Sequence, residues 1–466
     1  MDVRLAVKSY KHSSSSVSGE RLINCFAEPQ PGGAKAPVIV RGCPGVSEWS
    51  RIGLGPLRGV IKMNGLTYIV SGAELWSVDA NKNAVLRGSG ITGDELVGMA
   101  ENGFEIVIAT GLGVFSYLVS AGTTIAVAGV DAADTVTFMN ARFVLEKKGT
   151  NQFYISAVND GRTYDPLDFA SAEGDSDGIL VVKQFNGLLY LFGPKTIEVW
   201  EYTGAAIFAF QAIRGNVLAY GIQNSRMIAV DDSTVFFMGT DRVAYRLTGG
   251  GVGRISDYAI EQRWAKLASV SDGFAFTVPS EGHKMIYFTY PSASVTFGYD
   301  LSTNLWHERN SYDYTGVERS WRIGMSIVTD SGLILVGDRE SNIMGTIDNE
   351  VWTEFGNPLI TTVITPPVSD RGRDMAVNCL ELDMETGVGL TTGQGSDPKI
   401  IMSYSRDGGK TFGNERENGL GKRGEYGTRV RWTGLGSGRQ YSFKFVVSDP
   451  VKRTFLAARI PDFYSS

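Results

Sequence analysis

The sequence is poor in the residue types that metal centres and hydrolytic triads require. Its 466 residues include only three cysteines and three histidines, namely Cys25, Cys43, Cys379, His12, His283 and His307. The cysteines do not have the paired spacing of a zinc site, and their odd number does not suit a disulfide framework. The histidines have no motif partner nearby. We therefore expect three free thiols, no metal, no cofactor and no catalytic residues, in a protein that stays in a reducing compartment.

Long apolar runs are also missing. No segment approaches the ~18 consecutive apolar residues of a membrane-spanning helix. The first 19 residues carry four charged side chains and lack the apolar core of a secretion signal. Proline is not raised, at 15 residues, whereas glycine is, at 57 residues. This glycine content, together with 23 Phe, 19 Tyr and 8 Trp, predicts many tight turns between β-strands.

A unit of two apolar strands separated by a turn recurs along the chain, and an aromatic residue lies near the end of the second strand. Seven segments fit this description: 66–79, 104–119, 141–157, 187–204, 233–250, 283–308 and 332–349. Their starts are 38, 37, 46, 46, 50 and 49 residues apart, which is the spacing of β-propeller blades. The sequence therefore predicts an all-β protein with a β-propeller over residues 57–357. We expect about seven blades, or six if the weak third segment belongs elsewhere.

The residues on either side of the predicted propeller differ from it in composition. Residues 1–56 are rich in Ser, Gly and Pro and predict an extended N-terminal arm. Residues 358–374 contain two adjacent prolines and a charged SDRGRD stretch, which predict a linker. Beyond it, alternating strands predict a C-terminal β-sandwich over 375–466. The best helical pattern lies at 257–269, with Asp257 as the expected N-cap.

Three short patterns resemble functional motifs, and each is expected to be structural. The SRDGGKTF segment at 405–412 matches one Asp box, a hairpin in which Asp407 caps the turn and Gly409 takes an unusual φ. A sialidase would need several such boxes and a Tyr/Glu pair. The G-x-G-x-x-G spacing at 419–424 precedes a strand and predicts a loop, since a dinucleotide site needs a following helix. Asp175 and Asp177 lack the other calcium ligands and are expected in a solvated turn.

Charge is distributed unevenly along the chain. Residues 399–466 contain 13 Lys and Arg against 6 Asp and Glu, whereas the first 398 residues contain 31 against 44. The body is therefore acidic and the tail basic. Within the tail, Arg429 and Arg431 would point to one face of a predicted strand, with Lys422 and Arg423 just before them. We interpret these four residues as a contact for an acidic partner or for phosphates, with a solvated sheet face as the alternative.

An ordered set of segments resembles one viral family. The first group is INCFAE at 23–28, GCPG at 42–45 and RG at 58–59. The second is GRTYDPLDFASAE at 161–173, followed by DGI at 177–179. The third and strongest comprises LFG at 191–193, TIE at 196–198 and YTGA at 202–205. Together they resemble the packaged-DNA stabilisation proteins, also called tail hub or nozzle proteins, of short-tailed bacteriophages. The resemblance extends over nearly the whole chain, with Cys25 where an aliphatic residue is expected.

That resemblance implies a structural protein of the virion tail, made in the host bacterial cytoplasm, and not an enzyme. Members are expected to form a homo-hexameric ring below the portal and its adaptor protein. The ring would extend the channel for double-stranded DNA, which passes without sequence-specific binding. It would also retain packaged DNA and carry tail needle and fibre or spike proteins. The alternative is a glycan-binding or glycan-hydrolysing β-propeller, which several Asp boxes or an arginine-lined central pocket would indicate.

Overall fold

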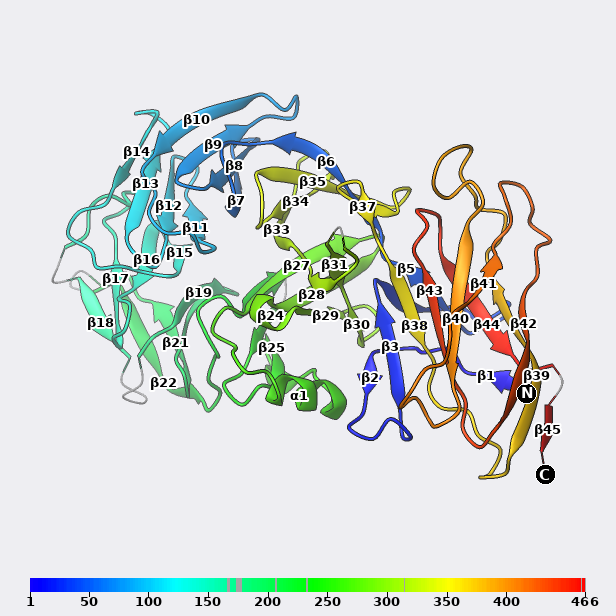
Figure 1. The fold of residues 1–466 in the computed structure, drawn as a ribbon. Helices are drawn as coiled ribbons and strands as arrows, with labels where there is room; N and C mark the ends of the chain where they lie inside the picture. The colour runs from blue at the N-terminus through cyan, green and yellow to red at the C-terminus, as the bar shows by residue number, and fades with distance from the viewer. Residues whose placement is uncertain are drawn as a thin grey trace.

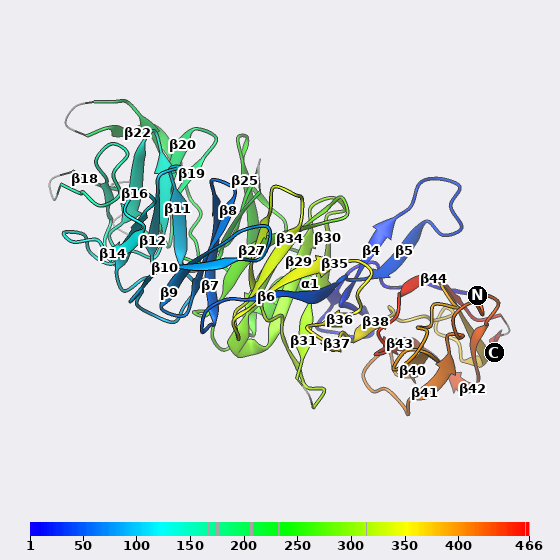
Figure 2. The same ribbon diagram turned by 90° about the horizontal axis from the view of Figure 1, so that it is seen from above.

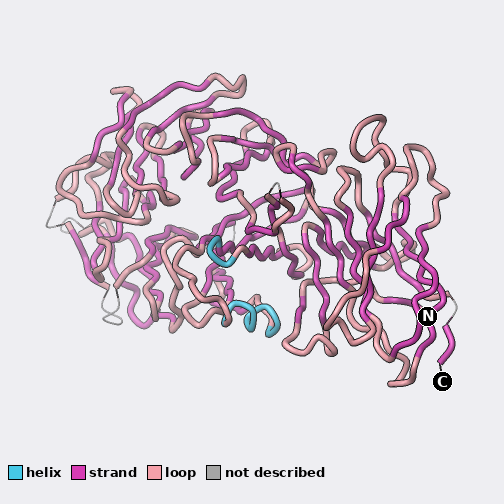
Figure 3. Tube along the Cα trace, viewed as in Figure 1, coloured by secondary structure: helices cyan, strands magenta, loops and turns pink. Residues whose placement is uncertain are grey.

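Strands form most of the molecule and are arranged in two bodies that lie side by side (Figures 1 and 3). A computed structural model describes residues 1–165, 168–172, 178–205, 208–231, 234–313, 315–461 and 463–465. In this part of the chain, seven groups of four antiparallel strands surround a common axis, and a β-sandwich lies beside the ring. The fold is therefore a seven-bladed β-propeller with a C-terminal β-sandwich, as the sequence predicted.

In each blade except the last, the four strands follow one another in chain order from the axis to the outer edge. Blade 1 is β7 (Leu57–Met63), β8 (Leu66–Ser71), β9 (Glu74–Val78) and β10 (Ala84–Ser89); blade 2 is β11 (Gly98–Glu101), β12 (Glu105–Ala109), β13 (Val114–Leu118) and β14 (Thr123–Ala126); blade 3 is β15 (Val136–Met139), β16 (Arg142–Glu146), β17 (Gln152–Ile155) and β18 (Phe169–Ser171); blade 4 is β19 (Val181–Phe185), β20 (Leu188–Phe192), β21 (Ile197–Tyr202) and β22 (Phe210–Leu218). Blade 5 is β23 (Ile228–Asp231), β24 (Thr234–Met238), β25 (Ala244–Thr248) and β26 (Gly251–Arg254); blade 6 is β27 (Phe274–Ser280), β28 (His283–Tyr290), β29 (Val295–Asp300) and β30 (Leu305–Glu308); blade 7 is β33 (Ile323–Val328), β34 (Ile334–Asp338), β35 (Ile343–Asp348) and β6 (Gly45–Arg51).

The seven segments found in the sequence contain the second and third strands of the seven blades, and the segment 283–308 also contains the fourth strand of blade 6. These strands have neighbours on both sides and pack against adjacent blades, so their residues are the most apolar. All five residues of β12 are buried, for example, whereas three of the four in the outer strand β14 are exposed. The Asn-Gly pairs at 64–65 and 186–187 form inner hairpin turns, in which both residues take positive φ values, as a type I′ turn requires.

Blade 7 closes the ring with a strand from the beginning of the chain. Strand β6 pairs antiparallel with β35 from Arg51 opposite Ile343 to Gly45 opposite Asp348. The short strands β36 (Thr353–Glu354) and β37 (Asn357–Pro358) follow beside it, and β31 (Asn310–Tyr312) pairs with β32 (Glu318–Ser320) between blades 6 and 7. This closure joins the two ends of the propeller through backbone hydrogen bonds.

The predicted helix is present as α1 (Tyr258–Ala265), between blades 5 and 6. The Asp257 side chain accepts a hydrogen bond from the Ile260 backbone N–H at 3.2 Å, which confirms it as the N-cap. Trp264 is fully buried against the blade 6 aromatics Phe297 and Trp306. The short 3-10 helix η1 (Pro291–Ala293) lies in the turn between β28 and β29. Among the described residues, no helix is long and apolar enough to cross a membrane.

The sandwich has two sheets whose inner faces form one core. The first contains β4 (Cys25–Pro29), β5 (Val38–Gly42), β44 (Thr454–Arg459), β39 (Met375–Met384) and β42 (Val430–Gly438), with β1 (Asp2–Val3) and β45 (Phe463–Ser465) at its margins. The second contains β3 (Gly19–Ile23), β38 (Thr361–Ile364), β43 (Ser442–Val447), β40 (Lys399–Ser405) and β41 (Arg416–Gly419), with β2 (Tyr10–Lys11) beside β3. Leu380 and Leu382 of the first sheet share the core with Phe443 and Phe445 of the second.

Residues 1–56 were predicted to form an extended arm, but they contribute strands to both bodies. Strands β1, β4 and β5 complete the first sandwich sheet, and β3 lies in the second. The predicted linker also contains a strand, β38, which pairs with β3 and β43. These segments form strands because their backbone groups pair with those of neighbouring strands in the sheet. Their own sequences are rich in turn-forming residues and therefore do not predict a strand.

Candidate functional site

The joint between the two bodies is one continuous hydrogen-bonded sheet. Strand β3 is inserted between β30, the outer strand of blade 6, and β38 of the sandwich (Figure 1). Its pairing with β38 covers three residue pairs, but its parallel pairing with β30 covers only Ile23 opposite Glu308. The N–H of Asn24 adds one more bond, at 2.8 Å to the carbonyl oxygen of Glu308. The backbone link to the propeller is therefore short, and side chains must reinforce it.

The main reinforcement is a buried carboxylate held by two arginines. The side chain of Glu308 is 2% exposed and accepts hydrogen bonds from Arg21 of β3 at 3.0 and 2.5 Å. Arg263 of α1 donates to the same carboxylate at 2.8 Å. Burial alone would raise the pKa of Glu308, but the charges and hydrogen bonds of Arg21 and Arg263 outweigh it and hold that pKa well below its usual range. The cluster connects strand, helix and blade at one point.

The first segments of the family resemblance, INCFAE and GCPG, meet at this joint. Asn24 has a φ of 54°, donates from Nδ2 to the Ile360 carbonyl at 2.9 Å and accepts the Asn310 N–H at 2.9 Å. A Cβ on Gly45 would lie 2.5 Å from the carbonyl oxygens of Val351 and Thr353. Asparagine tolerates the left-handed conformation, and only glycine fits the close approach. No local sequence pattern indicates this structural role of Asn24 and Gly45.

Two further arginines are buried on either side of the joint. Arg309 donates to the Pro44 carbonyl at 2.7 Å and lies over the Trp321 ring. Arg453 donates to the Leu359 carbonyl at 2.5 Å and to Thr361 Oγ1 at 2.9 Å. Both guanidinium groups bind chain segments that cross from one body to the other. The joint therefore holds the sandwich in a fixed position against the propeller.

The four basic residues predicted as a partner contact lie together on one connection of the sandwich. Lys422, Arg423 and Arg429 are in the loop between β41 and β42, and Arg431 is the second residue of β42. All four are exposed, and Arg429 and Arg431 alternate with the buried residues Val430 and Trp432. Arg423 donates to Thr391 Oγ1 at 2.8 Å, but none of the four has an ion pair among the described residues. They are free to bind an external group.

Carboxylates on the same sheet limit how basic this face is. Glu381 of β39 lies directly opposite Arg431 in the strand register and opposite Arg459 on its other side. The Arg459 guanidinium is 4.0 Å from Glu381 and 3.7 Å from Asp383. Charges of both signs therefore alternate across the first sandwich sheet. The loop 420–429, with Lys422, Arg423 and Arg429 against Glu425, remains positively charged.

The Asp box has the hairpin geometry that its sequence predicted. Asp407 accepts hydrogen bonds from Ser405 Oγ, from the Lys410 and Thr411 N–H groups and from Thr411 Oγ1. Hydrogen bonds from Ser405 and Thr411 hold the pKa of Asp407 well below its usual range. Gly409 has a φ of 84°. The Asp407 carboxylate therefore stabilises the turn through these hydrogen bonds. Asp175 and Asp177, by contrast, lie outside the described residues.

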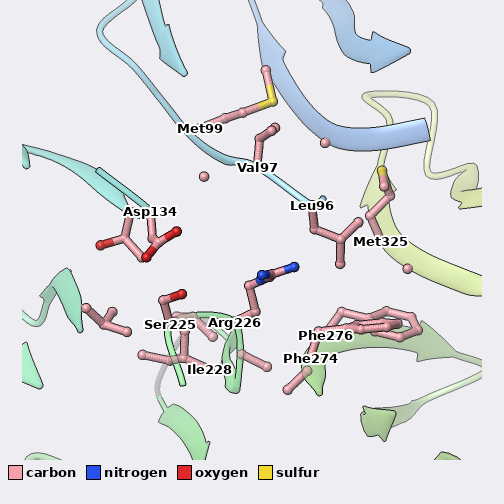
Figure 4. A pocket seen from close by; sticks show the side chains of 18 of the residues that line it. Leu96, Val97, Met99, Asp134, Ser225, Arg226, Ile228, Phe274, Phe276 and Met325 are labelled. Atoms are coloured by element: carbon pink, nitrogen blue, oxygen red, sulfur yellow. The ribbon is translucent and has the colours of Figure 1, made fainter. Parts of the chain in front are cut away.

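The axis of the propeller contains a cavity of about 340 Å³, which is lined by residues from the inner strand of every blade (Figure 4). Arg226 reaches into it and pairs with Glu95, while Arg58 donates to the carbonyls of Gly72, Thr92 and Glu95. A volume of about 340 Å³ is that of a cube about 7 Å on each side. The major groove of a DNA duplex is by itself about 12 Å wide, so a duplex cannot pass through this cavity. Any DNA channel must therefore lie outside the single propeller.

None of the three cysteines, all of which lie in the described part of the chain, forms a disulfide, as the sequence predicted. Burial raises the pKa of Cys25 and of Cys43, so neither is activated. Two histidines lie near them in blade 6. His283 is 2.8 Å from Asp300, and the hydrogen bond to that carboxylate raises the pKa of His283. Burial lowers the pKa of His307 to about 4. Cys25, Cys43, His283 and His307 are all buried near the joint.

A seven-bladed propeller fixed to a β-sandwich by a shared sheet is thus the class of protein that the fold defines. The family described as "Bacteriophage P22 Gp10, beta-propeller" matches residues 7–352, and "Bacteriophage P22 Gp10, beta-sandwich" matches residues 361–461. The chain belongs to this phage P22 Gp10 family. It is 21% identical over 339 residues to the tail hub protein gp10 of Salmonella phage P22, and the match covers 68% of each chain.

Solved propellers also resemble the chain. The WD40 propeller domain of Doa1 is 12% identical with a TM-score of 0.42, covering 66% of this chain and 98% of the domain. The Neurospora crassa Pan2 WD40 domain is 10% identical with a TM-score of 0.39, covering 64% of this chain and 94% of the domain.

Proposed function

We propose that this protein is a tail hub of a short-tailed phage and a structural component of the virion tail rather than an enzyme. The observation that carries the proposal is the match of both domains, in order, to the P22 Gp10 family, which includes a tail hub protein. The fixed joint supports it, because a protein that bears load between neighbours needs its domains held in one relative position.

In this proposal six copies form a ring below the portal and its adaptor, and the ring extends the DNA channel. The cavity inside one propeller is too small for DNA, so the channel would run between the copies along the ring axis. The acidic first 398 residues would repel the DNA phosphates, so the genome would pass without adhering to the wall. The ring would retain packaged DNA and provide a platform for needle and fibre or spike proteins.

The basic connection of the sandwich would bind an acidic adaptor or neighbouring subunit. Lys422, Arg423, Arg429 and Arg431 are exposed and have no internal ion pair in the described structure, so a partner could bind them without breaking an ion pair. The expected test variant is Arg429→Glu with Arg431→Glu. A matched control is Lys399→Glu with Lys452→Glu, which changes the net charge equally on the same domain.

The decisive experiment is imaging of DNA-filled particles that carry this chain. Six copies around the axis below the portal would support the hub, and absence of the chain from such particles would overturn it. Particles with the Arg429/Arg431 reversal should lose DNA or fail to assemble, whereas the control should not. If the reversed particles assemble normally and keep their DNA, the docking role of these residues fails while the hub itself stands.

A further inference from the structure

A groove beside the Asp box carries two arginines that have no carboxylate partner. It has a volume of about 480 Å³ and lies at the end of β40, and its lining includes Tyr404, Arg406, Asp407, Phe412 and Arg416. The only carboxylate in this lining is Asp407, which the hairpin hydrogen bonds already engage. The groove is therefore positively charged, and nothing in the described structure neutralises it.

The two guanidinium groups differ in how firmly they are held. Arg416 lies over the Tyr404 ring at 5.4 Å and donates to the Thr433 carbonyl at 2.9 Å, so its plane is oriented before any ligand arrives. Arg406 is exposed, and the hydrogen bond that its guanidinium donates in the described part of the chain is a weak one, 3.5 Å to the Ser437 carbonyl. An oriented arginine, an exposed and weakly bonded arginine and the half-buried Phe412 ring suit a carboxylate that is carried on a protein segment.

The same molecule offers the complementary charge on its propeller. The sandwich lies at one end of the elongated molecule, and blades 3 and 4 lie at the other (Figures 1 and 2). Residues 57–357, which form the propeller except for β6, contain 22 Lys and Arg against 34 Asp and Glu. Because the joint is fixed, the groove cannot turn back onto its own propeller. A contact between these opposite charges must join two copies.

We infer that the groove formed by Tyr404, Arg406, Phe412 and Arg416 docks an acidic segment on the propeller of a second copy of this chain. Such a contact uses different surfaces on the two copies, and repetition of it generates a closed ring if the rotation closes. The inference rests on the proposed ring and names the surface that builds it. Nucleic acid is a poorer occupant, because the net charge of the chain is -6 and would oppose its approach.

The test is site-specific photo-crosslinking in assembled particles. Phe412→p-benzoylphenylalanine places the reactive group in the groove, and Tyr426→p-benzoylphenylalanine places it on another exposed part of the sandwich as a control. We expect Phe412 to crosslink to a propeller peptide of a second copy, identified by mass spectrometry, and the control to give a different product. A crosslink to another tail protein, a crosslink to DNA, or no crosslink would overturn the inference.

A second pair of variants tests whether the crosslink depends on the charge of the two arginines or only on the closeness of the two copies. Arg406→Gln with Arg416→Gln should lower the crosslinking yield at least tenfold, and Lys399→Gln with Lys452→Gln, which removes the same charge elsewhere on the sandwich, should not. Unchanged yield in the arginine variant would contradict the role of the groove. If the yield is unchanged but imaging still shows six copies in the ring, only the docking surface is contradicted. If imaging shows no ring, the proposed function itself is contradicted.

Discussion

Glu308 is the best place to test whether the joint depends on buried charge. Glu308→Gln keeps the size of the side chain but removes the charge that neutralises Arg21 and Arg263. Those two side chains are only 19% and 21% exposed, so they would remain largely buried with Glu318, which lies 3.5 Å from Arg21, as a weaker counter-charge. Removing one member of a buried ion pair costs about 3 to 5 kcal/mol. Because both arginines keep some solvent contact, we expect a loss near the lower value, about 3 kcal/mol.

Urea unfolding followed by tryptophan fluorescence measures this loss. Glu48→Gln is the matched control, because Glu48 pairs with Arg51 on the surface, where the two side chains are 43% and 58% exposed. An exposed pair contributes about 0 to 1 kcal/mol, so the control should change little. If Glu308→Gln and Glu48→Gln unfold at the same urea concentration, the buried cluster does not stabilise the joint and the reasoning is refuted.

The same cluster predicts a pH dependence with a definite sign. The pKa of Glu308 is lowered in the folded state, so the unfolded chain binds the proton first as the pH falls. Its contribution is complete above the unfolded glutamate pKa of about 4.3 and is lost below it. The parent protein should therefore lose stability below about pH 4 more steeply than Glu308→Gln does. Equal slopes in the two proteins would contradict the lowered pKa.

Three other changes test separate parts of the structure. Gly45→Ala forces a Cβ to within 2.5 Å of two carbonyl oxygens and should destabilise by about 1 to 3 kcal/mol in thermal melting. Gly249→Ala, where the nearest atom is 4.0 Å away, should not do so. Burial lowers the pKa of His307 to about 4, so stability should fall as the pH drops from about 6.5 to 4, and His307→Phe should remove that fall in pH-dependent unfolding. Asp407→Ala leaves the turn donors without their acceptor; amide hydrogen exchange should quicken at 405–412 while the axis of the propeller stays protected.

The propeller could be predicted from the sequence because its middle strands carry an unambiguous signal. Strands such as β12 and β20 are buried on both faces, so their apolar runs repeat at the spacing of the blades. The outer strands are short and partly exposed, and they gave no such pattern. Closure by β6 could not be foreseen, because Gly45–Arg51 lies far from β35 in the sequence and has no periodicity of its own.

The candidate surfaces show the same limit. The alternation of Arg429 and Arg431 with apolar residues was visible in the sequence, and the structure places both on an exposed face. The groove was not visible, because Arg406 and Arg416 are ten positions apart and meet only through the Asp box hairpin. Nor could the pairing of Glu308 with Arg21 be found, since these residues are 287 positions apart and no local pattern joins them.

The structure of the joint gives a physical reason why two of the segments that resemble the family, INCFAE and GCPG, contain Asn24 and Gly45. A residue in a propeller blade can be exchanged for another apolar residue of similar size, since each blade only needs to pack against its neighbours. Asn24 and Gly45 meet stricter demands, because one combines a positive φ with two side-chain hydrogen bonds and the other has no room for a Cβ. The requirement to fix the sandwich against the propeller therefore confines these positions more tightly than the fold of either domain does. A hub that transmits force between ring neighbours would need that fixed geometry, which makes the joint, rather than the central cavity, the part of the chain on which the proposed function depends.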